Sequence, residues 1–415
     1  MSYDTPFHVA KKTPGAGLKD YEPQIDMAAL RRYRLDRVRA ELAARDYAGC
    51  VLYNPVNIRY ATGTRNMSVF CAHYPTRYAY IATDGPVVLF DNEVGMSPAT
   101  FTDSVDEVRP AVHWYYEGRG PFVREAADQW AAEIDDLLRA TGGGNRRLAV
   151  DRLGAMGFQP LAARDIEICD AQEVLEEARA IKSAEEIACL SVSIAVCEAG
   201  MARMQEALRP GISEQELWSL LVQFNAAHGG EWMETRLLAS GGRTNPWYQE
   251  CGEKLIRSGD LVAFDTDLIG AFGYCADISR TFHCGPSKPT DEQRRLYALA
   301  HAEIQHNLAL IKPGASFRDI SENCWRAPDE FLANRYSCLI HGVGLVDEYP
   351  DIVHPLDWDH AGYDGVVCEN MTLCVESYIG APGGAEGVKL EEQVLVTSNG
   401  VQLLTTYPFE ETLLA

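Results

Sequence analysis

The segment from Leu261 to Phe282, LVAFDTDLIGAFGYCADISRTF, places the strongest constraint on how this chain can fold. Both of its ends are rich in the large apolar residues that are typical of buried strands. Yet the segment also carries three aspartates, Asp265, Asp267 and Asp277. Because a buried carboxylate is costly unless something compensates its charge, the fold must supply a partner for these side chains.

A hairpin would bring the three aspartates together. Side chains alternate between the two faces of a strand, so Asp265 and Asp267 are expected on the same face. Gly270 and Gly273 allow a tight return, which places Asp277 on the next strand. Three carboxylates on one side repel each other unless a cation lies between them. The segment therefore predicts a site for one or two divalent metal ions.

A simpler interpretation is that one aspartate caps a turn and the others pair with Arg280. Polar residues in three later apolar segments favour the metal site. His341 lies in LIHGVG, Glu376 in TLCVESYIG, and Glu391 in VKLEEQVLV, with Glu392 beside it. Carboxylates together with one imidazole are ligands that suit manganese, iron, cobalt or zinc.

The first part of the chain alternates between helix and strand patterns. Residues 28–46 have the apolar spacing of an amphipathic helix. Residues 77–91 predict two strands around an Asp-Gly turn, and residues 121–140 predict a further helix. This alternation up to about residue 170 indicates a small α/β domain.

The second part begins with two helices whose first residues form Ser-x-x-Glu capping boxes, at Ser183 and Ser213. Strand and turn signals dominate after that, broken by a helix at 291–311. With 415 residues the chain is long enough for two ordinary domains. We predict an N-terminal domain over 1–178 and a catalytic domain over 179–415.

Composition excludes several classes of function. The formal net charge of −23 argues against nucleic-acid binding and against adhesion to anionic membranes. The N-terminus is polar and lacks the apolar core of a signal peptide, and no apolar run is long enough to predict a membrane span. The twelve cysteines are scattered without a CxxC pair. This pattern predicts reduced thiols, most of them core residues, in a cytoplasmic protein.

The order Asp, Asp, His, Glu, Glu resembles the metal-binding pattern of the creatinase, prolidase and methionine-aminopeptidase superfamily. Other segments resemble that superfamily too: KPGASFRDI, ENMTLCVES and KLEEQVLVTSNG in the second half, and PVNIRYATG in the first. The resemblance implies an α+β protein. Its parts would be a creatinase-like α/β domain followed by a catalytic domain with the pita-bread fold.

Two departures separate this sequence from the peptidases of the superfamily. Asp267 stands where those peptidases have a glycine, which adds a carboxylate. Their second histidine is missing, and Asp347, six residues after His341, takes about that place. Both departures resemble one branch, the dimethylsulfoniopropionate (DMSP) lyases of the DddP type. The stretches GGEWMETRLLASGGRTNPWYQECG and TTYPF resemble the same branch.

The resemblance to these lyases implies a set of roles. It implies a metal centre of one or two ions, iron in the first place with zinc or manganese as alternatives. It implies that Asp347 is the catalytic base, that Tyr336 lies in the substrate pocket, and that the protein is a homodimer. The metal ligands implied are Asp265, Asp267, Asp277, His341, Glu376 and Glu391.

DMSP carries a carboxylate at one end and a sulfonium at the other, and its β-elimination gives acrylate and dimethyl sulfide. A metal that binds the carboxylate would stabilise the negative charge that builds up there, and a carboxylate base would remove the proton. The sulfonium leaves as a neutral molecule and needs no acid. An aromatic wall would hold this cation; the candidates are Trp232, Trp247, Tyr248 and Tyr336.

Several alternatives remain open from the sequence. Arg236 and Arg243 could either hold the substrate carboxylate or fix a loop. The protein could be an X-Pro metallopeptidase, or a lyase or hydrolase that acts on another small zwitterion. A metal-free binding protein is a further class, but all six ligand positions carry residues that bind metals.

Overall fold

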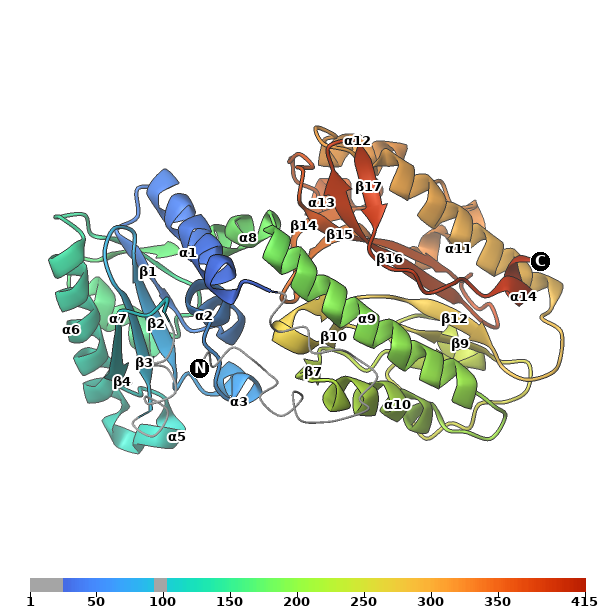
Figure 1. Ribbon diagram of the computed structural model, residues 1–415, viewed down its shortest axis with the longest axis horizontal. Coiled ribbons are helices and arrows are strands. Elements are labelled where there is room, and N and C mark those ends of the chain that lie inside the picture. Colours follow the sequence, from blue (N-terminus) through green and yellow to red (C-terminus); the bar gives the residue numbers. More distant parts are fainter. Residues whose placement is uncertain (1–24, 93–102) are drawn as a thin grey trace. The chain divides into compact units, whose positions relative to one another are not determined.

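The computed structural model describes residues 25–92 and 103–415. The described chain forms two compact units, which meet in the sequence between Arg179 and Ala180. Figure 1 labels their helices and strands.

The N-terminal unit is built on one six-stranded sheet with the order β4-β3-β2-β1-β5-β6. Its central strands are antiparallel, while β4, β5 and β6 each run parallel to a neighbour. The strands are β1 (Gly49–Leu52), β2 (Tyr78–Ala82), β3 (Val87–Asp91), β4 (Glu107–Pro110), β5 (Arg147–Val150) and β6 (Glu167–Asp170). The predicted pair of strands around the Asp-Gly turn is confirmed as β2 and β3.

Helices flank this sheet. They are α1 (Met27–Ala44), α2 (Pro55–Thr62), α3 (Ser68–His73), α5 (Tyr116–Arg119), α6 (Val123–Thr141), α7 (Ala155–Ala162) and α8 (Gln172–Ala180), with the 3-10 turn η3 (Gly120–Phe122). Helix α6 packs its apolar side on the sheet, where Trp130 meets Tyr53 and Trp114. Burying each such side chain stabilises the fold by about 1.5–3 kcal/mol. The predicted α/β character of this region is confirmed.

The C-terminal unit contains three sheets. Their orders are β11-β10-β7, β12-β9-β8 and β14-β13-β15-β16-β17. The strands are β7 (Trp232–Met233), β8 (Leu238–Ser240), β9 (Leu261–Phe264), β10 (Leu268–Ile269), β11 (Cys275–Ala276), β12 (Arg280–His283), β13 (Cys338–Val343), β14 (Asp347–Val353), β15 (Thr372–Ile379), β16 (Val388–Thr397) and β17 (Gly400–Leu403).

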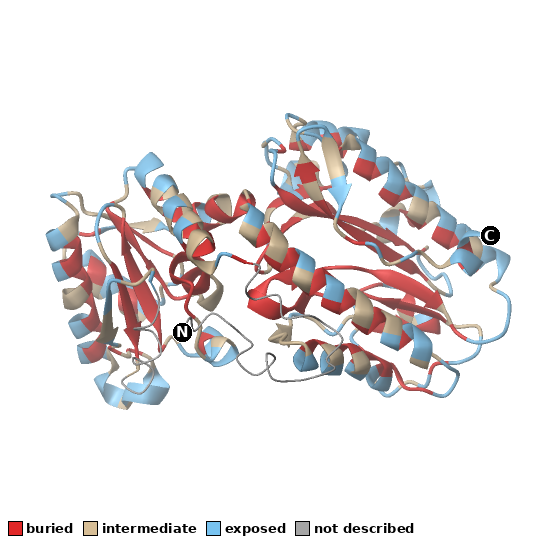
Figure 2. Cartoon of the chain, viewed as in Figure 1, coloured by how far each residue is buried: buried red, intermediate tan, exposed pale blue. Residues whose placement is uncertain are grey.

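Helices cover the outer faces of these sheets. They are α9 (Ala184–Ala207), α10 (Glu214–Ala227), α11 (Asp291–Leu310), α12 (Phe317–Asn323), α13 (Trp358–Ala361) and α14 (Glu411–Leu414), with the 3-10 turns η4 (Gly241–Thr244), η5 (Ala271–Gly273) and η6 (Asp329–Asn334). Helices α9 and α10 share one apolar core with the strands from β8 to β12. Helices α11 and α12 share another with the five-stranded sheet. Most residues of these strands are buried, although β14 and β17 carry exposed residues, and the helices have exposed outer sides (Figure 2).

The two predicted capping boxes are confirmed. Ser183 accepts a hydrogen bond from the backbone N–H of Glu186, whose carboxylate accepts one from the backbone N–H of Ser183. Ser213 and Glu216 repeat the arrangement at the start of α10. Each box satisfies two backbone donors that a helix start leaves unpaired.

The hairpin that carries the three aspartates is not one continuous pair of strands. The prediction that one strand carries Asp265 and Asp267 on the same face is wrong, because β9 ends at Phe264 and Asp267 has a φ of 35°, although the carboxylates of the three aspartates still converge. Strand pairing stops between β9–β12 and β10–β11. The Thr266 hydroxyl bridges this break, donating to the carbonyl of Ala276 and accepting from the N–H of Ile278, both at 2.9 Å.

Helix α9 is, among the residues that the structure describes, the one helix long and apolar enough to cross a membrane by length and composition. Half of its most apolar window is buried inside the protein. Its buried side chains, including Ile194, Cys197 and Met201, belong to the core of the C-terminal unit.

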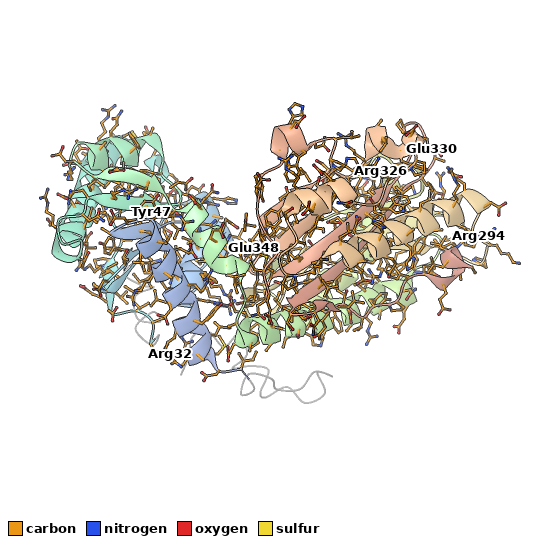
Figure 3. The ribbon with its side chains drawn as sticks, turned by 90° about the horizontal axis from the view of Figure 1, so that it is seen from above. Arg32, Tyr47, Arg294, Arg326, Glu330 and Glu348 are labelled. Atoms are coloured by element: carbon orange, nitrogen blue, oxygen red, sulfur yellow. The ribbon has the colours of Figure 1, made fainter. Side chains whose placement is uncertain are left out.

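All twelve cysteines are free thiols, and nine of them are buried, as the sequence predicts for core residues. Charged side chains lie on the outside of both units. Arg32 in the N-terminal unit and Glu330 in the C-terminal unit are examples, both exposed (Figure 3).

Candidate metal centre

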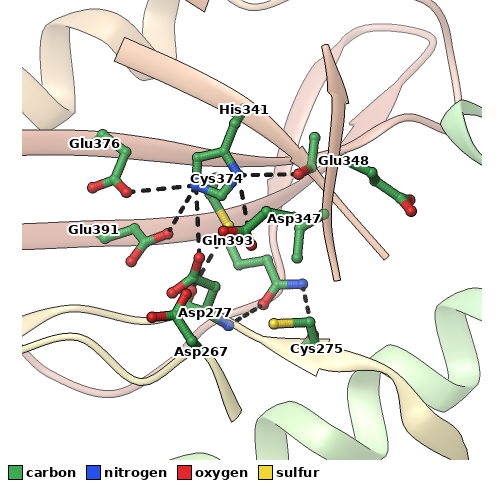
Figure 4. A network of polar contacts seen from close by, with 12 residues as sticks. Asp267, Cys275, Asp277, His341, Asp347, Glu348, Cys374, Glu376, Glu391 and Gln393 are labelled. Carbon is green, nitrogen blue, oxygen red and sulfur yellow. Dashed lines mark hydrogen bonds and ion pairs between the residues drawn. The ribbon is translucent and has the colours of Figure 1, made fainter. Parts of the chain in front are cut away.

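The acidic residues predicted from the sequence converge between two sheets of the C-terminal unit. The break in the β9–β12 hairpin supplies three carboxylates, and three neighbouring strands of the five-stranded sheet supply the imidazole and two more carboxylates (Figure 4). The converging residues are Asp265, Asp267, Asp277, His341, Glu376 and Glu391.

Their ligand atoms form overlapping groups. Asp265, Asp267 and Asp277 each place a carboxylate oxygen within 4.8 Å of one another. Nε2 of His341 lies 3.6 Å from Asp277 Oδ2, 3.5 Å from Glu376 Oε1 and 3.8 Å from Glu391 Oε1. These separations suit oxygen and nitrogen atoms that share a metal ion rather than direct hydrogen bonds.

Two buried oxygens show that the protein alone does not satisfy this cluster. Within the described part of the chain, Asp277 Oδ1 and Glu391 Oε1 have no hydrogen-bond partner. A buried polar atom left unsatisfied costs about 1–3 kcal/mol, and more when it is charged. A divalent cation between these oxygens would remove that cost, so the residues present fit a metal ion.

Burial and mutual repulsion disfavour ionisation at the centre. Burial raises the pKa of Asp277 well above its usual value, and Asp267 and Glu391 raise it further. The pKa of Glu391 is raised for the same reasons, burial first and the neighbouring Glu376 second. A bound cation would reverse this balance and hold these carboxyl groups in their charged form.

Lys389 lies inside the cluster and was missed by the sequence analysis. Its ammonium group is fully buried, pairs with Glu376, and lies 3.2 Å from Asp265 Oδ2 and 3.8 Å from Glu391 Oε2. It also donates to the Ser279 hydroxyl at 2.6 Å. Burial would lower the pKa of Lys389, but the surrounding carboxylates outweigh it and raise that pKa well above the usual value. The sequence contained the information needed to find Lys389. It stands two residues before the predicted ligand Glu391, so both side chains lie on the same face of the strand.

Arg280 does not pair with the three aspartates. It lies on the other side of β16, where its guanidinium contacts Glu392 at 2.7 Å and the carbonyl of Glu391 at 2.6 Å. It also donates to the carbonyl of Tyr407, which fixes the C-terminal segment. The simpler interpretation, in which Arg280 compensates the aspartates, is therefore wrong.

Asp347 lies at the start of β14, at the edge of the cluster. Its Oδ1 is 3.9 Å from Nδ1 of His341, and 55% of its side chain is exposed. The cluster ligands are buried by contrast; Asp277, Glu376 and Glu391 are each at most 3% exposed. Asp347 is thus near enough to act on a molecule bound at the centre, and solvent can reach it.

Two of the predicted aromatic residues lie together next to Lys389. Its Nζ is 5.1 Å from the ring centre of Tyr336 and 5.9 Å from that of Trp247. Tyr336 also stacks on Tyr248 at 5.6 Å. Trp232 is not in this group, since it packs against a separate apolar cluster that includes Cys374. Tyr336 and Trp247 are therefore the predicted aromatic residues that lie beside Lys389.

The two arginines fix a loop. Arg243 pairs with Glu214 and donates to the carbonyl of Glu250 at 2.8 Å. Arg236 donates to the carbonyl of Cys251 at 3.4 Å. These bonds join the loop between β8 and β9 to α10, which favours the second of the two roles that the sequence left open.

Cys374 and Gln393 complete the surroundings of Asp277. The Cys374 thiol donates to the backbone carbonyl of Asp277 at 3.8 Å, and the Asp277 N–H donates to Oε1 of Gln393 at 3.2 Å. Both residues occupy positions two away from a predicted glutamate ligand, so strand alternation would have placed them on the same face.

Comparisons with known proteins agree with this architecture. Residues 34–181 match the creatinase/prolidase N-terminal domain, and residues 188–398 match metallopeptidase family M24. The structure of an Xaa-Pro dipeptidase from Bacillus anthracis superimposes with a TM-score of 0.74 at 22% identity, covering 92% of this chain and 99% of the dipeptidase. This likeness concerns the fold alone. The fold and its acidic centre define a member of the creatinase and prolidase class with a pita-bread catalytic unit.

Two relatives specify the class further. The dimethylsulfoniopropionate lyase DddP of Roseovarius nubinhibens is 40% identical over 394 residues, which cover 94% of this chain and 88% of the relative. The lyase of the same name from Roseobacter denitrificans is 40% identical over 399 residues with the same coverage. The chain belongs to the DddP family of dimethylsulfoniopropionate lyases within metallopeptidase family M24.

Proposed function

We propose that this protein cleaves DMSP by metal-dependent β-elimination to acrylate and dimethyl sulfide. One observation carries the proposal beyond family membership. A carboxylate, Asp347, lies at the exposed edge of the acidic centre, 3.9 Å from the ring of His341. A general base needs this kind of place, close to a bound substrate and free of the buried ligand set.

The six predicted ligands would hold the metal. When bound, the metal supplies a Lewis acid for the substrate carboxylate, on which negative charge develops as the proton leaves. The five carboxylates and the single ammonium of Lys389 leave four negative charges, which two divalent ions balance. This charge count supports a binuclear centre, and the oxygen-rich donor set with one imidazole is compatible with iron, manganese or zinc.

Asp347 would take the proton from the carbon next to the substrate carboxylate. Its exposure keeps it solvated and able to exchange that proton with water after each turnover. The carbon–sulfur bond then breaks, the electron pair of that bond stays on sulfur, and dimethyl sulfide leaves as a neutral molecule. No acid is required at the leaving group.

Aromatic side chains would hold the sulfonium end. Tyr336 and Trp247, which lie together beside Lys389, are the candidates for this wall, and Trp232 stays a candidate from the sequence alone. A cation over such a ring gains about 0.5–2 kcal/mol, depending on how far it is desolvated. Because the Lys389 ammonium already lies near the rings of Tyr336 and Trp247, the sulfonium would approach this aromatic group from its exposed side, where Tyr248 stacks on Tyr336.

We also infer the cellular compartment and the oligomeric state of the enzyme. The free, mostly buried thiols support a reducing compartment such as the cytoplasm. Homodimerisation is part of the same proposal and rests on the resemblance to the superfamily.

The test is headspace gas chromatography of dimethyl sulfide after purified protein is mixed with DMSP, with acrylate measured in the same vial. We expect the two products in equal amounts. X-Pro dipeptides and a glycine betaine analogue serve as comparison substrates. Release of proline without dimethyl sulfide would establish the peptidase alternative and overturn the proposal.

A further inference from the structure

We propose that the buried ion pair between Lys182 and Glu348 is the device that positions Asp347. The inference rests on the proposed function, in which Asp347 is the base. It assigns a role to two residues that do not touch the metal centre themselves. Lys182 and Glu348 are positioning residues, because they would act only through the backbone of β14.

The pair is short and fully enclosed. Lys182 Nζ lies 2.6 Å from Glu348 Oε1, and the two side chains are 1% and 0% exposed. The backbone of Lys182 is fixed as well, since its N–H donates to the carbonyl of Asn370 at 2.9 Å. Removing the Glu348 carboxylate would leave the Lys182 ammonium as a buried charge without its counter-charge, which typically costs about 3–5 kcal/mol.

The two glycines of the HGVG segment allow a close approach of β14, Gly344 to the Glu348 carboxylate and Gly342 to the backbone. A Cβ at Gly344 would lie 2.0 Å from Glu348 Oε1, and a Cβ at Gly342 would lie 2.2 Å from the carbonyl oxygen of Tyr349. Any other residue at Gly344 would therefore occupy the path of the Glu348 carboxylate. The turn between β13 and β14 is shaped around this side chain.

Asp347 and Glu348 are neighbours in a strand, so their side chains point to opposite faces. In Figure 4 the Asp347 carboxylate faces His341, whereas that of Glu348 points away from the centre. Fixing the Glu348 side chain on the face of β14 that points away from the centre therefore sets the direction of the Asp347 side chain on the face toward it. Asp347 needs such help, because its own side chain is 55% exposed and gains little from packing.

The first experiment compares Glu348→Gln and Glu348→Asp in the full-length, metal-loaded protein. Both should keep the metal content of the wild type, because neither touches a ligand. We expect kcat with DMSP to fall by about 10- to 100-fold, since a displacement of about 1 Å costs that order of rate. KM should change by less than about threefold, because the carboxylate-binding groups stay in place.

Asp91→Asn serves as the matched control. Asp91 pairs with Arg77 at 2.8 Å in the N-terminal unit, and both side chains are at most 5% exposed. Its loss should lower the melting temperature as the Glu348 variants do, but leave kcat unchanged. A kcat that falls equally in Asp91→Asn and Glu348→Gln would mean that the loss reflects stability alone, and would overturn the inference.

A second experiment keeps the test valid if Glu348→Gln folds poorly. In an Asp347→Asn background, Lys182→Met and Glu348→Asp should cause no further loss of the residual rate, because the group they position is already gone. Independent, multiplicative losses would contradict the positioning role.

If Asp347→Asn alone retains full turnover, the proposed base is wrong. If Asp347→Asn is inactive while both Glu348 variants are normal, only the inference on the ion pair fails.

Discussion

Buried acids of the N-terminal unit and those of the acidic centre in the C-terminal unit are compensated in opposite ways. In the N-terminal unit, Asp91 pairs with Arg77 at 2.8 Å. Asp151 accepts hydrogen bonds from the backbone of Tyr53 and Asn54 and from the side chain of Asn57. In the C-terminal unit, five carboxylates crowd around one histidine, and two of their oxygens have no hydrogen-bond partner among the described residues.

The same contrast appears between two adjacent residues of β16. Glu392 is compensated by Arg280 at 2.7 Å and by the hydroxyl of Thr405. Glu391 points to the other face and keeps one unsatisfied oxygen. These buried acids of the N-terminal unit are therefore compensated by the protein itself, whereas the acidic centre of the C-terminal unit has the donor set and the unsatisfied oxygens that fit a cation.

The largest effect should come from Asp277→Ala. Loss of a carboxylate that faces both His341 and the other aspartates should reduce the bound metal to a trace and abolish dimethyl sulfide release. Metal analysis by mass spectrometry and the headspace assay measure both. Asp91→Asn is the counterpart in the other unit, and it should keep its metal. Full metal occupancy in Asp277→Ala would contradict the assignment of Asp277 as a metal ligand.

Asp347→Asn should lower kcat by about 10²- to 10⁴-fold, the usual contribution of a general base. The metal content and the melting temperature should stay at wild-type values, because Asp347 is exposed and lies outside the ligand set. Steady-state kinetics on metal-loaded protein provide the test, and near-normal turnover would remove Asp347 from the mechanism.

Lys389→Met tests how much of the charge in the centre the protein compensates by itself. Lys389 compensates part of the charge of Asp265 and Glu376, so its loss should make the protein more dependent on metal. We expect kcat to fall by about 10- to 100-fold, as is typical when a group that orients metal ligands is removed. The rise in melting temperature on adding metal should be larger than in the wild type, and Lys389→Arg should recover most of the loss. An equal rise in Lys389→Met and wild type would contradict this role.

The smallest effect concerns Glu303, which lies on α11 behind Glu376 and accepts a hydrogen bond from Ser377 at 2.6 Å. Burial, opposed by that hydrogen bond and assisted by the charge of Glu376, raises the pKa of Glu303 to about 8. The folded protein therefore binds more protons than the unfolded chain between about pH 4.5 and 8, so stability falls as pH rises through this window.

Glu303→Gln should remove this loss of folding stability at higher pH. The melting temperature of the variant should match the wild type near pH 5 and exceed it by a few degrees near pH 8. Melting curves of metal-loaded protein across that range give the answer. Parallel curves for the two proteins would show that Glu303 stays charged or is compensated in another way.

Much of the metal centre could be predicted because its residues break local rules. A histidine or a carboxylate in an apolar strand is conspicuous, and this marked His341, Glu376 and Glu391 without any structure. The helices with capping boxes were predictable for a similar reason, since their signals lie within a few residues of each other.

The remaining features depend on contacts between distant segments. The break at Asp265–Asp267 is stabilised by the Thr266 hydroxyl, which no periodicity reveals. Arg280 could have paired with the nearby aspartates, but it reaches Glu392 across the sheets. Lys389 was overlooked because a lysine in a strand ordinarily points to solvent. Only the three-dimensional arrangement shows that its strand has no solvent-exposed face.

The central claim is that the acidic centre works only with its cation. The direct measurement is a titration of metal-stripped protein with ferrous ion under anaerobic conditions, with bound metal, melting temperature and dimethyl sulfide release followed in the same samples. We expect turnover to be absent at the start, to rise with the metal bound, and to level off at two ions per chain together with the melting temperature. Undiminished dimethyl sulfide release from the metal-free protein would contradict it.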